Sequence, residues 1–488
     1  MTRFYFSAVV MMACGGTTTD TTDASDTSTP PISTDLTDVN CALNANVPTA
    51  LNCTWTSAAG GEGWIETWLD GDTPSPTPLG PSGTSHEVSA IGLRAGQTWN
   101  FRVITTTPDG DLVGPDQSVV TPAPPSYLPV NTVSNVEAGS LAADGYVLSA
   151  MINWQDSIPV IVNGEGQYVW WFEPPSGSLI VTTKLSRDGK SVLFATYDID
   201  WQQDVGTIWR VSLDGKTVTE TRALLAHHDF LENDDGTFTF FGYEYRDFGQ
   251  TSWASDVLRR VPEGTTNADD AVVEFSWFDS YPVEPWVADP LQDNVSLGNA
   301  DYEWTHSNSL MVNGDGHTYL MSKFLDVILK VDADGNIVWE MGGAYSDFTN
   351  PDGSEVWTSL SDHDLWSHAH MSHFWTDGFA VFDNGYYRND GSERSRAVEY
   401  TFDESTLQVE EVWSYEEPND GFTKLMGDVR KLDDTYLINW SSLSYVSEVD
   451  ALGEIVWMLD LDDTDGSGNK AIMSRITYLD DLYSPTPR

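Results

Sequence analysis

The sequence has little positive charge. Its 488 residues include 23 lysines and arginines against 75 aspartates and glutamates, so the formal net charge is −52. A chain this acidic argues against binding to nucleic acid, and against a polybasic patch that docks on an anionic membrane surface. It also means that an anionic substrate would need a local pocket of positive charge to overcome the global repulsion.

Long apolar runs and cysteines are scarce as well. The run at residues 4–13, behind Arg3, is too short to span a bilayer and is typical of the apolar core of an export signal. It ends in Met-Met-Ala-Cys14-Gly, which resembles a bacterial lipoprotein signal that makes Cys14 the lipid-bearing first residue. We therefore expect a signal peptide over residues 1–14 and an exported chain in the bacterial cell envelope, lipid-anchored at Cys14, periplasmic or at the cell surface. The alternatives are an ordinary export signal and an apolar start with an unmodified cysteine.

Helical periodicity is hard to find, whereas 39 glycines and 20 tryptophans fit an all-β protein with many turns. Residues 15–36 are Gly, Thr, Asp, Ser and Pro with almost nothing apolar, which predicts a disordered tether. Residues 37–123 alternate short apolar runs with Gly/Pro turns, which predicts a small β-sandwich. A stiff proline-rich linker, ending at Pro129, then leads into the third region, residues 124–488.

The small β domain has further features of its own. Its segment Ile91–Val103, with Trp55 upstream, resembles a fibronectin type III domain, although Trp99 stands where that family usually carries a tyrosine. Cys41 and Cys53 fall on the first two expected strands, and an exported chain permits a disulfide between them, worth about 3 kcal/mol for a loop this short. The alternative is two buried free thiols. Because the domain shows no catalytic cluster, we expect it to serve as a spacer or in adhesion. The proline-rich linker and the separate core patterns on its two sides predict that the domain folds alone.

One short motif, a strand that usually ends in Val-Trp, recurs in residues 124–488. Its stronger and weaker copies are Gly166–Trp170, Gly215–Thr219, Phe275–Trp277, Gly335–Trp339, Val412–Trp413 and Gly453–Trp457. Six copies at intervals of roughly 45–75 residues are typical of propeller blades with insertions. The sequence therefore predicts an all-β fold, a six-bladed β-propeller preceded by a small β-sandwich, in which the tryptophans pack the blades.

Each copy follows a hairpin with a polar turn. We expect the propeller to begin with outer strands and to end, at the C-terminus of the chain, with an inner strand. Inner strands are expected to begin near Val181, His228, His306, His370, Gly427 and Ser474. The C-terminal run at residues 472–479 should then complete the blade that residues 146–172 start. Such closure leaves no long free sheet edge.

Histidines are few, nine in all, yet three crowd into residues 368–373. One register also delivers a histidine three times, because His228, His306 and His370 each stand eight residues before a glycine. In a repeat fold, equivalent positions meet around one axis, so we expect these three to face one site. A lone strand histidine is usually a satisfied core or turn residue, but three in one register weaken that interpretation.

Several separate motifs in residues 140–488 resemble the bacterial arylsulfate sulfotransferases and follow that family's order. They are His227–Leu231, Trp304–Ser309, Ile337–Gly343, the stretch from Trp366 to Gly385, and Ser395–Tyr400. The resemblance implies a propeller that moves a sulfuryl group from one phenol to another, with no nucleotide sulfate donor and no cofactor. The implied partners are a small phenolic sulfate donor and a phenol acceptor, bound at a rim expected in the loops 246–256 and 344–365.

The resemblance also implies roles for particular residues. In the family a histidine is the nucleophile and is transiently sulfated, and that position maps to His370. Two histidines that surround the sulfate map to His228 and His306. The family's arginine maps to Lys323, which keeps the charge but loses the planar fork that grips two oxyanions. The chemistry fits, since a neutral imidazole can attack sulfur while its neighbours place charge on the equatorial oxygens of a loose transition state.

Two other classes of function stay open. One is a non-catalytic propeller that binds a small anion or a protein partner, which Lys323 favours and the three retained histidines disfavour. The other is a zinc or copper site formed by His368 and His370, two apart on a strand, with His306, although we expect no metal. The remaining histidines are expected in supporting or surface positions, namely His227, His317, His363 and His373.

Overall fold

The computed structural model describes residues 33–153, 156–198, 206–282, 300–359, 362–363, 365–386, 393–419, 421–462 and 470–486. The predicted signal peptide with Cys14, and residues 15–32 of the predicted tether, lie outside the described residues. In the described part of the chain, no helix is long and apolar enough to cross a membrane.

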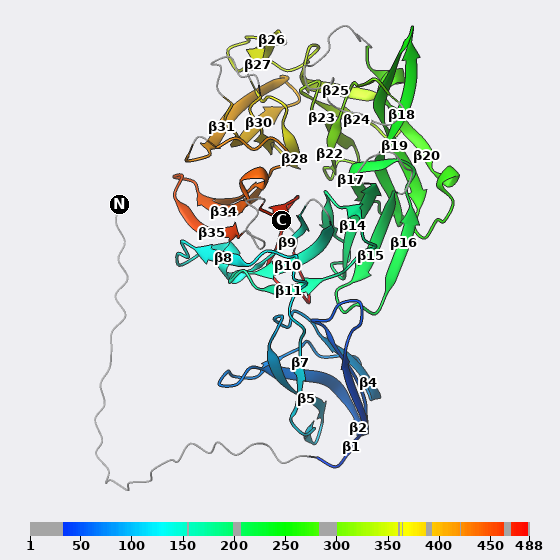
Figure 1. The fold of residues 1–488 in the computed structure, drawn as a ribbon, viewed down its shortest axis with the longest axis vertical. Coiled ribbons are helices and arrows are strands. Elements are labelled where there is room, and N and C mark those ends of the chain that lie inside the picture. Colours follow the sequence, from blue (N-terminus) through cyan, green and yellow to red (C-terminus); the bar gives the residue numbers. More distant parts are fainter. Residues whose placement is uncertain are drawn as a thin grey trace, which may run out of the picture.

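Six sheets surround one axis and form a β-propeller, with a smaller β domain beside it (Figure 1). Blade 1 consists of β9 (Tyr146–Ile152), β10 (Ser157–Asn163), β11 (Tyr168–Trp171), β36 (Ile472–Met473) and β37 (Thr477–Leu479). Blade 2 consists of β12 (Ser178–Leu179), β13 (Thr183–Leu185), β14 (Ser191–Asp198), β15 (Thr207–Ser212) and β16 (Val218–Arg222). Blade 3 consists of β17 (Ala226–Glu232), β18 (Thr237–Phe248), β19 (Thr251–Pro262), β20 (Val272–Ser276) and β21 (Tyr302–Glu303), the last parallel to β19.

The other three blades repeat the plan. Blade 4 consists of β22 (Ser307–Val312), β23 (Thr318–Ser322), β24 (Val327–Val331) and β25 (Ile337–Gly342). Blade 5 consists of β28 (His370–Trp375), β29 (Gly378–Asp383), β30 (Arg396–Asp403) and β31 (Gln408–Glu416). Blade 6 consists of β32 (Asp428–Leu432), β33 (Thr435–Trp440), β34 (Tyr445–Asp450), β35 (Ile455–Leu461) and β8 (Asn131–Ser134). Outside the blades lie β26 (Trp357–Ser359) with β27 (Asp362–His363), and the short helices α1 (Leu141–Asp144), α2 (Trp277–Ser280), η1 (Ala268–Asp270) and η3 (Ser441–Leu443).

The prediction of a six-bladed all-β propeller is confirmed. The predicted motif copies contribute to β11, β16, β20, β25 and β31, the outermost strands of their blades, and to β35, which in blade 6 has only β8 outside it. Trp170, Trp277 and Trp457 are buried, and the indole nitrogen of Trp457 donates to the carbonyl of Gly164 at 2.9 Å. That bond joins blade 6 to blade 1, and a shared apolar cluster with Trp171 packs the same junction. The repeated tryptophans therefore pack the blades, as the sequence indicated.

Two segments close the ring. The C-terminal strands β36 and β37 pair with β9, where Met473 faces Met151 and Thr477 faces Leu148, as predicted. A second closure was not predicted. In it, β8 pairs with β35 and is added to the outer edge of blade 6. The four residues of β8 come directly after the proline-rich linker and carry too short an apolar pattern to be recognised as a strand.

The N-terminal domain is a seven-stranded sheet. Its strands are β1 (Leu36–Leu43), β2 (Leu51–Trp68), β3 (Ser75–Pro76), β4 (Ser82–Ala90), β5 (Thr98–Thr107), β6 (Gly110–Val113) and β7 (Gln117–Val120). The long strand β2 pairs with β1 and β4 through its first half and with β5 through its second half. Cys41 and Cys53 face each other across β1 and β2 and form a disulfide.

The N-terminal domain is packed on blades 1 and 2 (Figure 1). Val47 and Ala50, in the turn before β2, are fully buried in one apolar cluster with Leu213 and Leu482 of the propeller. At the rim of this contact, the ammonium of Lys216 lies 2.8 Å from a carboxylate oxygen of Glu87. The domain expected to be a separate spacer therefore shares part of its core with the propeller.

One predicted loop is a hairpin. Residues 246–256 were expected to form part of the pocket rim as a loop, but they extend the paired strands β18 and β19. The pairing continues without a break from Thr237 opposite Pro262 to Phe248 opposite Thr251. Residues 344–365 include β26 and β27, while residues 360–361 and 364 of that expected loop lie outside the described residues.

Candidate active site

The structure brings His228, His306 and His370 together at the end of the central channel where the inner strands begin. The rings of His228 and His306 meet edge to face, with their centroids 4.5 Å apart. Burial is the main cause of the lowered pKa of His370, Lys323 is the next, and proximity to His306 lowers it further. His370 in turn contributes to the lowered pKa of His228, again after burial.

The three histidines reach this point by different backbone paths. His228 lies in a bulge of β17 at φ +53, and His306 precedes β22 at φ +51. His370 is the first residue of β28 and pairs with Phe382. Equal spacing to a glycine therefore does not mean equal positions in the ladders. A positive φ is uncommon for a residue other than glycine, and bulges re-aim side chains, so local distortion and not strand alternation directs two of these rings.

Asn384 determines which ring nitrogen of His370 carries the hydrogen. Its Nδ2 donates to the carbonyls of Thr423 at 2.7 Å and Met426 at 3.0 Å, so its Oδ1 faces the imidazole. That oxygen lies 2.7 Å from Nδ1 of His370 and can only accept. Nδ1 therefore carries the hydrogen, and Nε2 of the neutral ring presents a lone pair, the form that a nucleophile needs.

Asn384 and Gly385 form an Asn-Gly pair, which in a sequence is typical of a turn at the end of a strand. The chain does turn at Gly385, with φ +78, but the amide of Asn384 is fully buried beside His370. Asn-Gly is a strong turn signal, and it concealed the role of the side chain.

His306 contacts a buried carboxyl. Its Nδ1 lies 2.8 Å from Oε2 of Glu303, a residue of β21 with no exposed surface. Burial raises the pKa of Glu303 to about 8, and the charge of Asp256 adds to this effect. The pKa of His306 is lowered by its own burial and by Lys323. The pair is therefore a neutral acid beside a neutral imidazole at neutral pH.

A second chain of side chains holds His228. Its Nδ1 lies 2.9 Å from Nδ1 of His227, whose Nε2 lies 3.1 Å from a carboxylate oxygen of Asp256. Burial alone would raise the pKa of Asp256, but hydrogen bonds from His227, Ser307 and Thr305 lower it below its usual value. His227, expected in a supporting or surface position, thus joins His228 to a buried carboxylate.

Lys323 lies in the turn after β23, and its backbone N–H donates to the carbonyl of His306 at 3.1 Å. The side chain is 4% exposed, with Nζ 5.6 Å from the ring centroid of Phe324 and 5.7 Å from that of Tyr386. Its charge contributes to the lowered pKa of both His306 and His370. The residue that maps to the family's arginine therefore places a cation beside two of the three histidines.

Arg475 supplies a guanidinium that the sequence interpretation missed. It follows β36 in the segment that closes blade 1, and its Nη1 lies 2.5 Å from Oδ2 of Asp229. The other oxygen of Asp229 lies 2.8 Å from Nζ of Lys184. Burial and the neighbouring histidines are the larger causes of the lowered pKa of His228, and the charge of Arg475 adds to them. The charge of Arg475 also contributes to the lowered pKa of His370. The predicted closure by residues 472–479 was the signal that could have placed this arginine at the axis.

Two cationic side chains lie at the site of a very acidic protein, and one of them, Arg475, is paired with Asp229. Burial lowers the pKa of His228, His306 and His370, so all three rings are neutral at neutral pH. The positive charge then comes from Lys323 and Arg475. Such a local concentration of cations is what a small anion requires in a chain of net charge −52.

The described histidines do not assemble a metal site. His368 precedes β28 at φ +56, so it does not share a strand face with His370 as expected. Its Nδ1 contacts the hydroxyl of Ser367 at 3.2 Å. His363 lies in β27, outside the residues whose side chains are described. Among the described residues, no group of three or more His, Cys, Asp or Glu side chains has the arrangement to hold a metal ion.

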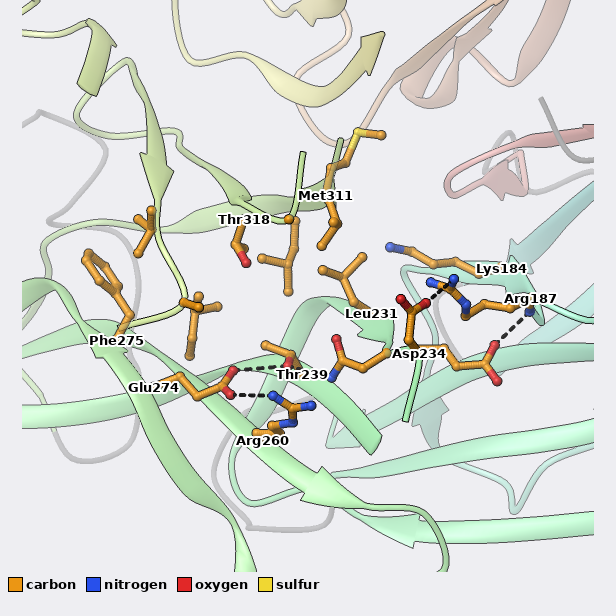
Figure 2. A pocket seen from close by; sticks show the side chains of 18 of the residues that line it. Lys184, Arg187, Leu231, Asp234, Thr239, Arg260, Glu274, Phe275, Met311 and Thr318 are labelled. Carbon is orange, nitrogen blue, oxygen red and sulfur yellow. Dashed lines mark hydrogen bonds and ion pairs between the residues drawn. The ribbon is translucent and has the colours of Figure 1, made fainter. Parts of the chain in front are cut away.

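A separate cavity of about 600 Å³ opens where the inner strands end (Figure 2). None of the three site histidines lines it. Its basic side chains are paired, since Arg187 meets Asp234 and Arg260 lies 3.2 Å from Glu274. Lys184, on its wall, reaches Asp229 and through it Arg475, so one ion-pair chain links the cavity to the histidine end of the channel.

Comparison with known proteins gives one family. A family model described as Arylsulfotransferase (ASST) matches residues 131–457. No curated protein sequence matches the chain. Among solved structures, a Bacteroides caccae protein of unknown function shares 12% identity at a TM-score of 0.39, covering 68% of this chain and 97% of its own. The β-propeller domain of Myceliophteria thermophila Cps50 (Swd1) also shares 12% identity at a TM-score of 0.39, covering 74% of this chain and 95% of its own.

Proposed function

Because the chain belongs to the arylsulfotransferase family, we propose that it moves a sulfuryl group from a phenolic sulfate ester to a phenol, with His370 as the nucleophile. Nε2 of His370 attacks sulfur, the bond from sulfur to the donor's phenolic oxygen breaks, and a bond from sulfur to nitrogen forms. The leaving oxygen takes the electron pair and a proton. The acceptor phenol then loses its proton, its oxygen attacks the same sulfur, and His370 returns to its starting form.

The observation that carries this proposal is the contact between His370 and Asn384. The amide oxygen 2.7 Å from Nδ1 supports one tautomer of the ring and meets the positive charge that develops during attack. The lowered pKa of His370 keeps the ring neutral, so its lone pair is present at neutral pH.

The cations beside His370 suit the transition state. Sulfuryl transfer should share the loose transition state of phosphoryl transfer, in which charge is spread over the equatorial oxygens. Lys323 and Arg475 can face those oxygens as cations, and His228 and His306 can contribute N–H donors. No step of this scheme uses a cofactor.

The test combines an assay with direct detection of the intermediate. Purified chain is mixed with an aryl sulfate and a free phenol, and sulfate is followed on the phenol. We expect transfer with ping-pong kinetics, and a sulfuryl adduct on the His370 peptide after donor alone. His370→Ala should abolish both. Near-normal transfer by His370→Ala, or an adduct on another residue, would overturn the assignment.

A propeller that only binds a small anion is the second candidate, and Lys323 in place of the family's arginine favours it. Such a protein would bind aryl sulfate or inorganic sulfate without turnover. If wild-type chain binds sulfate in calorimetry but transfers nothing from any aryl sulfate tested, this second function replaces the first.

We also propose that the chain is exported and lipid-anchored at Cys14 in the cell envelope. The Cys41–Cys53 disulfide supports export, because disulfides persist in oxidising compartments. Full-length chain expressed in a bacterium should enter the membrane fraction and incorporate labelled palmitate, whereas Cys14→Ala should do neither. A soluble wild-type chain without label would contradict the anchor.

A further inference from the structure

Glu303 is a buried carboxyl that the steps above leave without a role. It lies on β21, which is held beside β19 by the pairing of Glu303 with Ala254. Its Oε2 contacts Nδ1 of His306 at 2.8 Å, and its Oε1 accepts from the hydroxyl of Tyr243 at 3.3 Å. Among the described residues, these two hydrogen-bond partners form no ion pair with Glu303 when His306 is neutral, so neither offsets the cost of burying an ionised carboxyl.

The groups around Glu303 come from four elements of blades 3 and 4. They are Asp256 on β19, His227 on β17, Tyr243 and Tyr245 on β18, and Lys323 after β23. Burial is the main cause that raises the pKa of the Glu303 carboxyl to about 8, and Asp256 adds to it. His227 and Lys323 act in the opposite direction but do not outweigh burial. Glu303 therefore holds a proton at neutral pH.

The protonated carboxyl sets the hydrogen on His306. Its O–H donates to Nδ1 of the neutral ring, so the ring's own hydrogen is on Nε2, on the side away from Glu303. His306 is 15% exposed through its side chain and contacts the ring of His228. The Nε2–H group of His306 therefore faces the site, while the Glu303 proton is hydrogen-bonded to Nδ1 of the same ring.

We propose that Glu303 is the proton reservoir of sulfuryl transfer and acts through His306. The inference rests on the proposed function. In the donor half-reaction, Nε2 of His306 gives its hydrogen to the leaving phenolate oxygen, and the Glu303 proton moves to Nδ1. The pair is left as a carboxylate and a neutral ring with its hydrogen on Nδ1.

The acceptor half-reaction restores the pair. The acceptor phenol gives its proton to Nε2 of His306 as its oxygen attacks sulfur, and the Nδ1 hydrogen returns to Glu303. One proton thus passes from the acceptor to the donor's phenol with each turnover, and no other acid or base is consumed. A residue that accepts a proton in one half-reaction and gives it up in the other suits a reaction in which the donor and acceptor phenols do not react with each other directly.

The test uses Glu303→Gln, which keeps the shape of the side chain but cannot release a proton. Two donors are compared in the donor half-reaction, with release of the first phenol followed after rapid mixing. Phenyl sulfate leaves as a strongly basic phenolate, whereas 4-nitrophenyl sulfate leaves as a weakly basic one that needs no proton. We expect Glu303→Gln to slow release from phenyl sulfate by about 10²-fold, the scale of general acid catalysis, and to change 4-nitrophenyl sulfate little.

A second readout needs no variant. With wild-type chain, release from phenyl sulfate should fall as pH rises past about 8, where Glu303 loses its proton, and release from 4-nitrophenyl sulfate should not. The matched control is Glu340→Gln. Burial also raises the pKa of Glu340 to about 8, but it lies on the outer strand β25 and should leave both rates unchanged.

The outcomes separate this inference from the proposed function. If wild-type chain transfers from both donors while Glu303→Gln slows both equally, or neither, the reservoir is wrong and the transferase stands. An equal loss would mean that Glu303 only supports the position of His306. If wild-type chain transfers from neither donor, the transferase fails and the reservoir fails with it.

Discussion

Nδ1 of His370 and Oδ1 of Asn384 lie 2.7 Å apart, and the amide nitrogen of Asn384 is occupied by two backbone carbonyls. The side chain cannot flip without losing both of those hydrogen bonds. The contact therefore imposes one tautomer on His370 and directs the lone pair of Nε2 away from Asn384. Through this contact, blade 5 and the loop that leads into blade 6 prepare the nucleophile.

Asn384→Ala should slow the donor half-reaction by about 10²- to 10³-fold, the scale of one lost preorganised hydrogen bond. Without the acceptor, His370 populates both tautomers and its developing positive charge has no partner. The measurement is single-turnover release of phenol, with thermal unfolding to separate folding from rate. An unchanged rate in a folded variant would mean that the tautomer is set elsewhere.

The propeller was predictable because its packing is repeated. Each blade buries an outer strand against its neighbour, so a similar strand pattern recurs six times in the sequence, and most copies carry a tryptophan. The approximate positions of the inner strands follow from that repeat. The strand β8 was not predictable, because its four residues join blade 6 only through pairing with β35, a contact that leaves no local pattern.

The candidate site was predictable only in part. His228, His306 and His370 stand out because histidine is rare in this chain, and the family resemblance gives them roles. Glu303 and Asp256 reach the site from β21 and β19, strands that do not line the axis. Both residues matter because they are buried and because they contact His306 and His227. No spacing of residues in the sequence predicts that burial or those contacts.

Lys323→Arg should keep or raise activity, because it restores a planar fork beside His306 and His370. Lys323→Ala should depress kcat/KM for an aryl sulfate, because it removes one of the two cations of the site. The comparison needs full kinetics for each variant. A Lys323→Ala variant with wild-type kcat/KM would show that this lysine does not meet the sulfate.

Acid should destabilise the protein partly through His373, which is outside the proposed site. Burial, with Arg430, lowers its pKa to about 3 in the folded chain, against about 6.5 when unfolded. Between these values the unfolded chain binds more protons, so stability falls as pH falls below about 6.5. At pH 5 this amounts to about 2 kcal/mol.

His373→Gln should lose less unfolding free energy than wild type between pH 7.5 and pH 5 in urea titrations. His317→Gln, at a half-exposed position, should behave as wild type; equal acid sensitivity of both variants would contradict the prediction.

Val47 should stabilise the contact between the N-terminal domain and the propeller. Val47→Ala removes methyl groups from a fully buried position shared with Leu213 and Leu482, so unfolding free energy should fall by about 1–3 kcal/mol. Val120→Ala is the matched control, because Val120 is 64% exposed in the same domain and should change stability by less than about 0.5 kcal/mol. For the same reason, a fragment of residues 124–488 should unfold at a lower temperature than the longer chain. Equal melting temperatures would mean that the shared core adds no stability.

Arg475 should control the pH range of the reaction. Burial is the main cause of the lowered pKa of His228 and His370, and the charge of Arg475 makes a smaller contribution, so Arg475→Gln should let both pKa values rise modestly. The nucleophile would then be protonated at higher pH, and the acid limb of the donor half-reaction should move upward. Arg475→Lys keeps the charge and should retain the position of that limb, although it loses the fork that meets Asp229. Arg430→Gln removes a cation that lines the opposite cavity and should leave the limb where it is. If the limb stays in place in a folded Arg475→Gln variant, Arg475 holds Asp229 and the closing strand but does not tune the nucleophile.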